Sequence, residues 1–180
     1  MIPRLETNRL LLREWRPDDF EDYAAMCADK DVMHFLGGIQ ERNDAWRSMA
    51  GSIGHWHMRG YGMWVVTDKT DGGFLGRIGL VNPEGWPSLE VGWALVSAAQ
   101  GRGYATEAAA AAMRYGFLTQ PVGRLISSID PDNVASQAVA KRLGETKGEL
   151  THLRIRGEEF PVEIWSITRD EWQRRDVAGI

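Results

Sequence analysis

Hydrophobic and polar positions alternate most regularly between Leu89 and Val96, in the run LEVGWALV. One face of the predicted strand carries Leu89, Val91, Trp93 and Leu95, and the other carries Glu90, Gly92, Ala94 and Val96. The second face is small apart from its one carboxylate. This strand therefore has one apolar face and one face that leaves space for a substrate.

The rest of the chain divides into further strand-like and helix-like segments. We expect helices over about 17–29, 41–59, 102–118 and 133–143, and strands over about 9–15, 61–68, 74–81, 124–130, 148–156 and 159–168. The helix over 102–118 is the strongest of these predictions, because the segment is rich in alanine and has neither proline nor glycine before Gly116. Hairpins are expected early and late, with a strand–helix–strand crossover between them.

Composition narrows the class of protein. A length of 180 residues fits one domain, 1–180, better than two. The single cysteine, Cys27, cannot form an internal disulfide, which suits a reducing compartment. The start has no apolar signal-peptide core, and no apolar run approaches the ~20 residues of a spanning helix. We therefore expect a cytoplasmic protein with no membrane partner, and the net charge of −4 argues against a nucleic acid partner.

A glycine-containing turn separates the alternating strand from the alanine-rich helix: Gln100-Gly101-Arg102-Gly103-Tyr104-Ala105. Backbone N–H groups of such a turn, together with the unpaired donors and positive dipole end of the helix start, suit a pyrophosphate. Gly101 and Gly103 let a ligand approach the main chain, and Arg102 adds positive charge. A plain helix start after a loop is the alternative.

The turn resembles the acetyl-CoA signature of the GNAT acetyltransferases, in which Gln or Arg is followed by two residues, Gly, one residue, and Gly or Ala. Gln100, Gly103 and Ala105 match it. The run IDPDNVAS, which ends at Ser136, resembles the family's second landmark. The opening LETNRLLLR is typical of the branch that includes the ribosomal-protein N-terminal acetyltransferases, to which the resemblance is closest. The resemblance covers about residues 5–168.

The resemblance implies an α/β (α+β) fold. Its central sheet is twisted, mixed and mostly antiparallel, with about seven strands, helices on both faces, and a splayed central parallel pair where the cofactor enters. It implies acetyl-CoA as co-substrate, an amine acceptor and no metal. The implied cofactor contacts are Ala94, Leu95, Val96, Gln100, Gly101, Arg102, Gly103, Tyr104, Ala105, Thr106, Asn133 and Ser136. The backbone of the strand around Trp93 to Val96 is expected to pair with the pantetheine arm and to hold the thioester oxygen.

Direct acetyl transfer needs a neutral amine, and Glu90 is the candidate base, directly or through water. The alternative is a carboxylate that only pairs with a cation at the end of the sheet. His34 is a second candidate base, because its segment precedes the loop at Gly37-Gly38, which could line the acceptor site.

Many family members place a tyrosine in the helix after the asparagine to protonate the leaving thiolate, but this chain has Ala140 there. The ribosomal branch is thought to use the serine of its Asn-x-x-Ser motif, which is Ser136 here. A first-turn serine bonded to the backbone is the alternative. Because a thiol has a pKa of ~8.5, its thiolate leaves without strong assistance, so transfer without any acid is a further alternative. Asn133 is a cofactor and substrate contact, an N-cap, or both.

Trp56 and Trp86 lie near the helix end and the loop that could frame an acceptor, so we expect substrate contacts there and at His34. His55 and His57 do not share a helix face and do not suggest a metal site.

Two functions remain open. The first is an N-acetyltransferase acting on a protein N-terminal α-amine or a small-molecule amine; the second is a non-catalytic acyl-CoA-binding module, which Ala140 favours slightly. The protein is expected to be a monomer or a homodimer.

Overall fold

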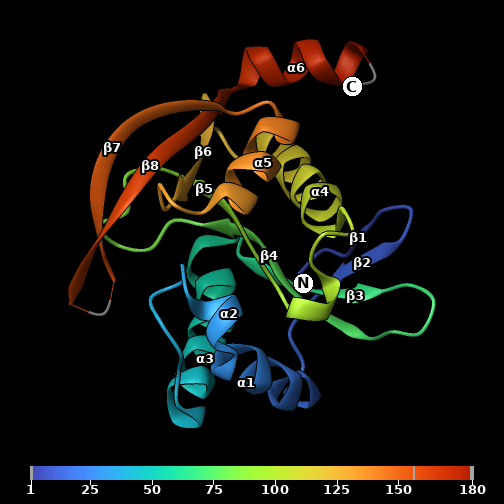
Figure 1. The fold of residues 1–180 in the computed structure, drawn as a ribbon. Coiled ribbons are helices and arrows are strands. Elements are labelled where there is room, and N and C mark those ends of the chain that lie inside the picture. The colour runs from blue at the N-terminus through green and yellow to red at the C-terminus, as the bar shows by residue number, and fades with distance from the viewer. Residues whose placement is uncertain (1, 156, 179–180) are drawn as a thin grey trace.

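A computed structural model describes residues 2–155 and 157–178 as a mixed sheet with helices on both faces (Figure 1). The eight strands lie in the order β1-β2-β3-β4-β5-β6-β8-β7. Their bounds are β1 Leu5–Glu6, β2 Leu10–Arg13, β3 Met63–Asp68, β4 Phe74–Val81, β5 Glu90–Leu95, β6 Arg124–Ile129, β7 Thr146–Ile155 and β8 Glu158–Thr168. Neighbouring strands are antiparallel except β5 and β6, which are parallel. The expected fold class is confirmed, and the strand beyond the expected seven is the short β1.

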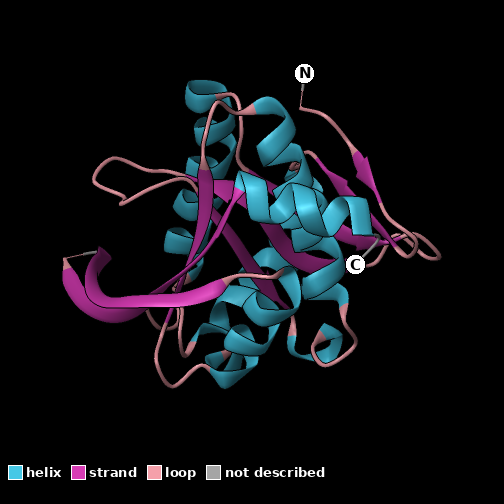
Figure 2. Ribbon diagram, turned by 90° about the horizontal axis from the view of Figure 1, so that it is seen from above, coloured by secondary structure: helices cyan, strands magenta, loops and turns pink. Residues whose placement is uncertain are grey.

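The helices form two layers, which Figure 2 shows on either side of the sheet. One layer contains α1 (Phe20–Ala28), α2 (Lys30–Met33) and α3 (Arg42–Arg59), and the other contains α4 (Tyr104–Thr119) and α5 (Val134–Leu143). A final helix, α6 (Arg169–Ala178), follows β8. Within the described residues, no helix combines the length and the apolar character needed to cross a membrane.

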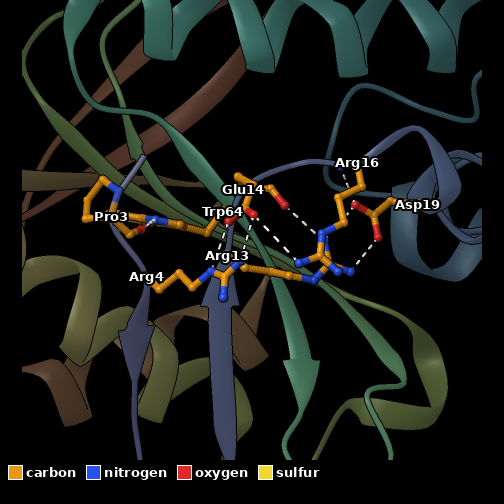
Figure 3. Close-up of polar contacts among 7 residues, drawn as sticks. All are labelled: Pro3, Arg4, Arg13, Glu14, Arg16, Asp19 and Trp64. Atoms are coloured by element: carbon orange, nitrogen blue, oxygen red, sulfur yellow. Dashed lines mark hydrogen bonds and ion pairs between the residues drawn. The ribbon is translucent and has the colours of Figure 1, made fainter. Parts of the chain in front are cut away.

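The strand expected to reach Trp15 ends at Arg13, where a buried ion pair turns the chain. The Arg13 guanidinium donates to both carboxylate oxygens of Asp19, at 2.8 and 2.6 Å (Figure 3). Asp19 also accepts a hydrogen bond of 2.7 Å from the backbone N–H of Arg16. Because Asp19 immediately precedes α1, this cluster fixes how the first helical layer leaves the sheet.

Two helices that were not expected from the sequence have clear capping signals. Asp29 accepts hydrogen bonds from the backbone N–H groups of Asp31 and Val32 at the start of α2. Thr168 and Glu171 form a reciprocal capping pair at the start of α6. Both helices are short and lack a clear apolar period, so the periodicity on which the other helix predictions rest is absent from them.

The parallel strands β5 and β6 diverge soon after they meet. Glu90 lies opposite Ile126, and the Ile126 N–H donates to the Leu89 carbonyl. The next carbonyl of the chain that faces β6 is that of Val91, two residues after Leu89. It accepts instead from the side-chain hydroxyl of Ser127, at 2.8 Å. A side chain thus takes the place of a backbone partner where the strands separate. The remainder of β5 is left with one edge open.

Candidate functional site

Two cavities meet at the diverging strands. The glycine-turn cavity, about 840 Å³, lies between the 100–106 turn, the end of β5 and α5. The Glu90 cavity, about 910 Å³, lies between β5, α3, the 83–86 loop and the β7–β8 hairpin. Five residues line both cavities: Phe35, Leu36, Trp93, Asn133 and Ser136. A molecule bound in one cavity can therefore contact a molecule bound in the other.

The turn before α4 has the backbone shape of an anion cradle. Gly101 and Gly103 have φ values of 71° and 79°, a region that side-chain-bearing residues adopt at a cost. The Gln100 amide donates to the Leu95 carbonyl at 3.1 Å and so ties the turn to β5. The first N–H groups of α4 lack partners within the helix and face this turn.

Thr106 adds a side-chain group to the cradle. Its hydroxyl Oγ1 is buried in the lining of the glycine-turn cavity and has no hydrogen-bond partner in the part of the chain that the structure describes. A buried polar group without a partner is costly unless a ligand satisfies it. The turn, the helix start and Thr106 together present hydrogen-bond donors suited to an anionic group at this end of the cavity.

Three of the expected cofactor contacts lie differently from the expectation. Tyr104 is buried and lines the cavity, but its hydroxyl donates at 3.2 Å to Asp68, the partly exposed last residue of β3, which does not line the cavity. The Arg102 guanidinium is held over the Tyr104 ring, 4.7 Å from its centre, and does not line the cavity. Val96 does not line it either; its N–H donates to the Leu75 carbonyl on the β4 side at 3.0 Å.

The direction of the Val96 N–H also shows which backbone groups of β5 face the gap. Successive residues of a strand direct their N–H groups to opposite edges. The N–H groups of Trp93 and Leu95 therefore point toward the side that β6 has left. These two groups are placed to pair with an extended ligand in the gap.

An anchor behind the turn was not anticipated from the sequence. The Glu107 carboxylate accepts hydrogen bonds from the Thr7 hydroxyl at 2.6 Å and from the backbone N–H and Nε of Arg9 at 2.9 and 2.7 Å. Arg9 also donates to the Arg102 carbonyl at 3.0 Å and lies over the Tyr104 ring. The LETNR opening thus fixes the turn to β2, a role that no local pattern could show because the partners lie about a hundred residues apart.

Trp93, Asn133 and Ser136 form the junction between the cavities. The Asn133 side chain caps α5 by accepting from the Ser136 N–H at 3.0 Å. The indole Nε1 of Trp93 donates to Ser136 Oγ at 3.1 Å. The sequence placed Trp93 in the core; its alternation with Val91 and Leu95 gave no signal that the strands part beside it.

Glu90 lies in the other cavity with one carboxylate oxygen held in place. Its Oε2 accepts hydrogen bonds of 2.7 Å from Trp86 Nε1 and from the Ser128 hydroxyl. Burial raises the pKa of Glu90 to about 7, although the hydrogen bonds from Ser128 and Trp86 and the charge of Arg77 act in the opposite direction. The other oxygen, Oε1, lies on the side of Gly92, where an added Cβ would be 3.5 Å from Oε1 and 2.9 Å from Met63 Cε. Gly92 therefore lets the Met63 methyl group and the Glu90 carboxyl group share this part of the cavity wall, and a side chain at position 92 would crowd both.

A second buried carboxyl group, Glu145, was missed by the sequence reading. Its Oε1 lies 3.0 Å from the Ser127 hydroxyl, which already donates to the Val91 carbonyl. Since a hydroxyl has one hydrogen, a protonated Glu145 that donates to Ser127 satisfies both contacts. Burial raises the pKa of Glu145 to about 8; the Ser127 contact lowers it and the charge of Glu90 raises it further.

The three expected substrate contacts separate into two groups. Trp86 lines the Glu90 cavity, and His34 is exposed at its rim with its ring against Phe35. Trp56 does not line it; it is buried against Trp64, and its Nε1 donates to the Met63 carbonyl at 2.9 Å. The face of α3 that carries Trp56 points to the sheet, so the structure does not place Trp56 in the cavity lining as expected.

The side chains that could bind a metal ion form no cluster of ligands among the described residues. Both ring nitrogens of His55 are engaged, with the Tyr61 carbonyl and the Asn82 N–H. Across residues 2–155 and 157–178, no group of three or more His, Cys, Asp or Glu side chains is arranged to hold an ion.

Comparisons with known proteins show the family of the chain. The model of the acetyltransferase (GNAT) domain matches residues 9–146. The uncharacterized protein YkkB of Bacillus subtilis is 33% identical over 149 residues, which cover 78% of this chain and 84% of YkkB. An acetyltransferase crystal structure from Agrobacterium tumefaciens is 31% identical, with a TM-score of 0.82 and coverage of 94% of this chain and 96% of that one.

The fold extends to more distant enzymes. RimL, a ribosomal L7/L12 alpha-N-protein acetyltransferase solved in complex with coenzyme A, is 19% identical; the match has a TM-score of 0.73 and covers 94% of this chain and 98% of RimL. At that identity the likeness concerns the fold alone. The family match over most of the chain, together with the identity to YkkB, shows that this protein belongs to the GNAT acetyltransferase family.

Proposed function

We propose that the protein is an acetyl-CoA-dependent N-acetyltransferase that passes the acetyl group directly to a primary amine in the Glu90 cavity. The observation that carries this proposal is the junction at Trp93, Asn133 and Ser136, which lines both cavities. Direct transfer requires such a junction, because donor and acceptor must meet without a covalent enzyme intermediate. On this proposal, residues 1–180 form a single domain that acts in the cytoplasm as a monomer or homodimer.

Acetyl-CoA supplies an acetyl group activated as a thioester. The N–H groups at the start of α4, the glycine turn and Thr106 would hold its pyrophosphate, with Gly101, Gly103 and Ala105 leaving room for it. The gap-facing N–H groups of Trp93 and Leu95 would pair with the pantetheine arm and bind the thioester oxygen. One donor aimed at a developing oxyanion is worth ~3–4 kcal/mol in related acyl-transfer chemistry.

Glu90 is the proposed general base. A carboxyl group with a pKa of about 7 is part ionised at neutral pH and can accept the proton of an α-ammonium group, whose pKa is ~7.7–8.0. Trp86 and Ser128 hold Oε2, so Oε1, on the side of Gly92, is the oxygen proposed to accept the proton. His34, exposed at the rim, is the alternative base.

Ser136 is the proposed acid for the leaving thiolate. Its Oγ accepts from Trp93, which leaves its own hydrogen to donate. Ala140, buried in α5, offers no group for this role.

The acceptor is a protein N-terminal α-amine or a small-molecule amine. The LETNRLLLR opening and the Asn133-x-x-Ser136 motif support placement near the ribosomal-protein branch. The Thr7–Glu107 and Arg9–Glu107 contacts give that opening a structural role, independent of the acceptor.

Thiol release from acetyl-CoA on addition of an amine panel tests the proposal. We expect amine-dependent release with a stoichiometric N-acetyl product, identified by mass spectrometry. The non-catalytic acyl-CoA-binding module predicts instead that calorimetry detects acetyl-CoA binding while no amine increases thiol release. Absence of binding to acetyl-CoA or CoA would contradict both functions.

A further inference from the structure

Arg77 is a cation in the wall of the Glu90 cavity, and among the described residues its side chain forms no hydrogen bond. It lies on β4, is partly buried and lines the cavity. Its Nε is buried with no hydrogen-bond partner, and no carboxylate forms an ion pair with it in residues 2–155 and 157–178. A guanidinium group withdrawn from water without a partner is costly, so this position favours a ligand that supplies one.

The other charged groups around the cavity are engaged or exposed. Glu84 pairs with Arg59 at 3.7 Å, and Asp130 accepts from the backbone N–H of Asp132. Arg154 lines the same cavity but is exposed to solvent. Of the two arginines that line the Glu90 cavity, Arg77 is therefore the partly buried one.

The strand register places Arg77 and Glu90 on one face of the sheet. Arg77 lies opposite Ala94, and Glu90 lies opposite Val81, so the two are four residues apart along the strands, roughly 13 Å between backbones. Gly92 lies between them on that face. Both side chains can reach over this small residue, and the charge of Arg77 acts on Glu90.

From this placement we infer that Arg77 is an anion-binding residue of the acceptor site, and that the acceptor is a small amine that also carries an acid group, as amino acids do. This inference rests on the proposed function and narrows its acceptor. The amine lies at Glu90, and the carboxylate or other oxyacid group lies at Arg77. Arginine binds such groups with two parallel hydrogen bonds.

The cavity walls also fit the body of such an acceptor. Phe35, Trp86, Phe160 and Val162 contribute apolar surface. A polyamine would instead bring a second positive charge toward Arg77, which electrostatics disfavours.

The test compares matched acceptors: a series of α-amino acids, their carboxamides, the corresponding decarboxylated amines, aminoalkyl phosphonates and spermidine. We expect wild-type kcat/KM for a carboxylated acceptor to exceed that for its carboxamide by at least about 10-fold. Arg77→Met, which keeps the chain length but removes the charge, is expected to collapse that ratio toward one, mainly through KM. Arg77→Lys is expected to retain part of it. The phosphonates show whether carboxylate shape or negative charge alone is recognised.

A binding measurement separates failure of this inference from failure of the proposed function. Calorimetry with N-acetyl amino acids and their N-acetyl amides, in the presence of CoA, needs no turnover. Preferential binding of the acid forms that Arg77→Met abolishes supports the inference even if no tested amine is acetylated. Equal binding of acid and amide forms, or a preference for spermidine, overturns it. CoA-dependent thermal stabilisation of Arg77→Met confirms that the variant is folded, and Arg77→Gln is the second variant if it is not.

Discussion

Trp93 Nε1 donates a hydrogen bond of 3.1 Å to Ser136 Oγ, and this bond joins β5 to the first turn of α5 where the two cavities meet. A serine in a first helical turn often uses its hydroxyl on the backbone. Here the structure shows no such bond for Ser136 Oγ within the described residues; the hydroxyl accepts from an indole, and its hydrogen remains for a ligand.

Replacing Ser136 by alanine is expected to lower kcat by roughly 10²-fold, the lower end for general acids, because a thiolate leaves with little assistance. Acetyl-CoA affinity should change little. Trp93→Phe, which removes the indole donor but leaves the hydroxyl, measures how far the indole orients Ser136 and should lower kcat less than Ser136→Ala does. Steady-state kinetics with CoA-binding calorimetry measures both. A fully active Ser136→Ala enzyme would show that the thiolate leaves unassisted.

Glu90→Gln is expected to lower acetyl transfer by roughly 10²–10⁴ at neutral pH while acetyl-CoA affinity stays near the wild-type value. The wild-type rate should rise with pH through about 7, because the carboxyl group must lose its proton before it can accept one. The defect of Glu90→Gln should shrink above the acceptor's own pKa, ~8 for an α-amine, where the amine is neutral without help. A loss that persists unchanged at high pH would assign Glu90 to substrate positioning.

Ser128→Ala tests the same carboxyl group without removing it. The Ser128 hydroxyl donates to Glu90 Oε2 and lowers its pKa, so its loss should raise that pKa and move the acid limb of the pH–rate profile to higher pH. A shift of about one pH unit corresponds to ~1.4 kcal/mol, the size of one charge-assisted hydrogen bond. An acid limb that stays in place would mean that it reports another group, such as His34.

Glu145→Gln is expected to stabilise the protein at alkaline pH. The pKa of Glu145 in the folded state, about 8, is above the ordinary ~4.3, so the folded protein holds this proton more tightly than the unfolded chain. Its contribution to the free energy of unfolding is therefore present at low pH and is lost as the pH rises from about 4.5 through about 8. Glutamine can still donate to Ser127 and has no proton to lose. Near pH 9 the variant should gain on the order of 5 kcal/mol over wild type, and near pH 5 much less, in denaturant unfolding. An identical pH profile for both proteins would contradict a protonated Glu145.

Thr106→Val is expected to weaken CoA binding by roughly 10- to 100-fold, as loss of a hydrogen bond to a charged phosphate does. The unliganded protein should be unchanged or slightly more stable, because Thr106 Oγ1 has no partner to lose among the described residues. Calorimetry with CoA and thermal unfolding without it give the two measurements. Thr119→Val at the far end of α4, where the hydroxyl bonds the Tyr115 carbonyl, is a control that should leave CoA affinity unaltered. Unchanged affinity in Thr106→Val would place the phosphates elsewhere.

Local patterns were enough to predict most elements and the glycine turn. The alternation from Leu89 to Val96 appears as β5, and the alanine-rich segment as α4, because each pattern is a property of neighbouring residues. The turn at Gly101 and Gly103 was predictable for the same reason: its positive φ values are a local demand that glycine meets. The candidates Glu90, Asn133 and Ser136 also came from the sequence, and the structure brings them to the linings of the two cavities.

Tertiary structure alone decided which side chains complete the site. Trp56 and Trp86 were both expected at the acceptor site, yet one packs on Trp64 and the other holds Glu90. Glu145 and Arg77 gave no local signal, because burial and the absence of a partner depend on segments distant in the chain. The sequence by itself determined the family, the order of elements and the turn, since these follow from short-range geometry. The buried charges and the junction at Trp93 were decided by long-range packing, because the cost of burying a polar group is set by what the rest of the fold places around it.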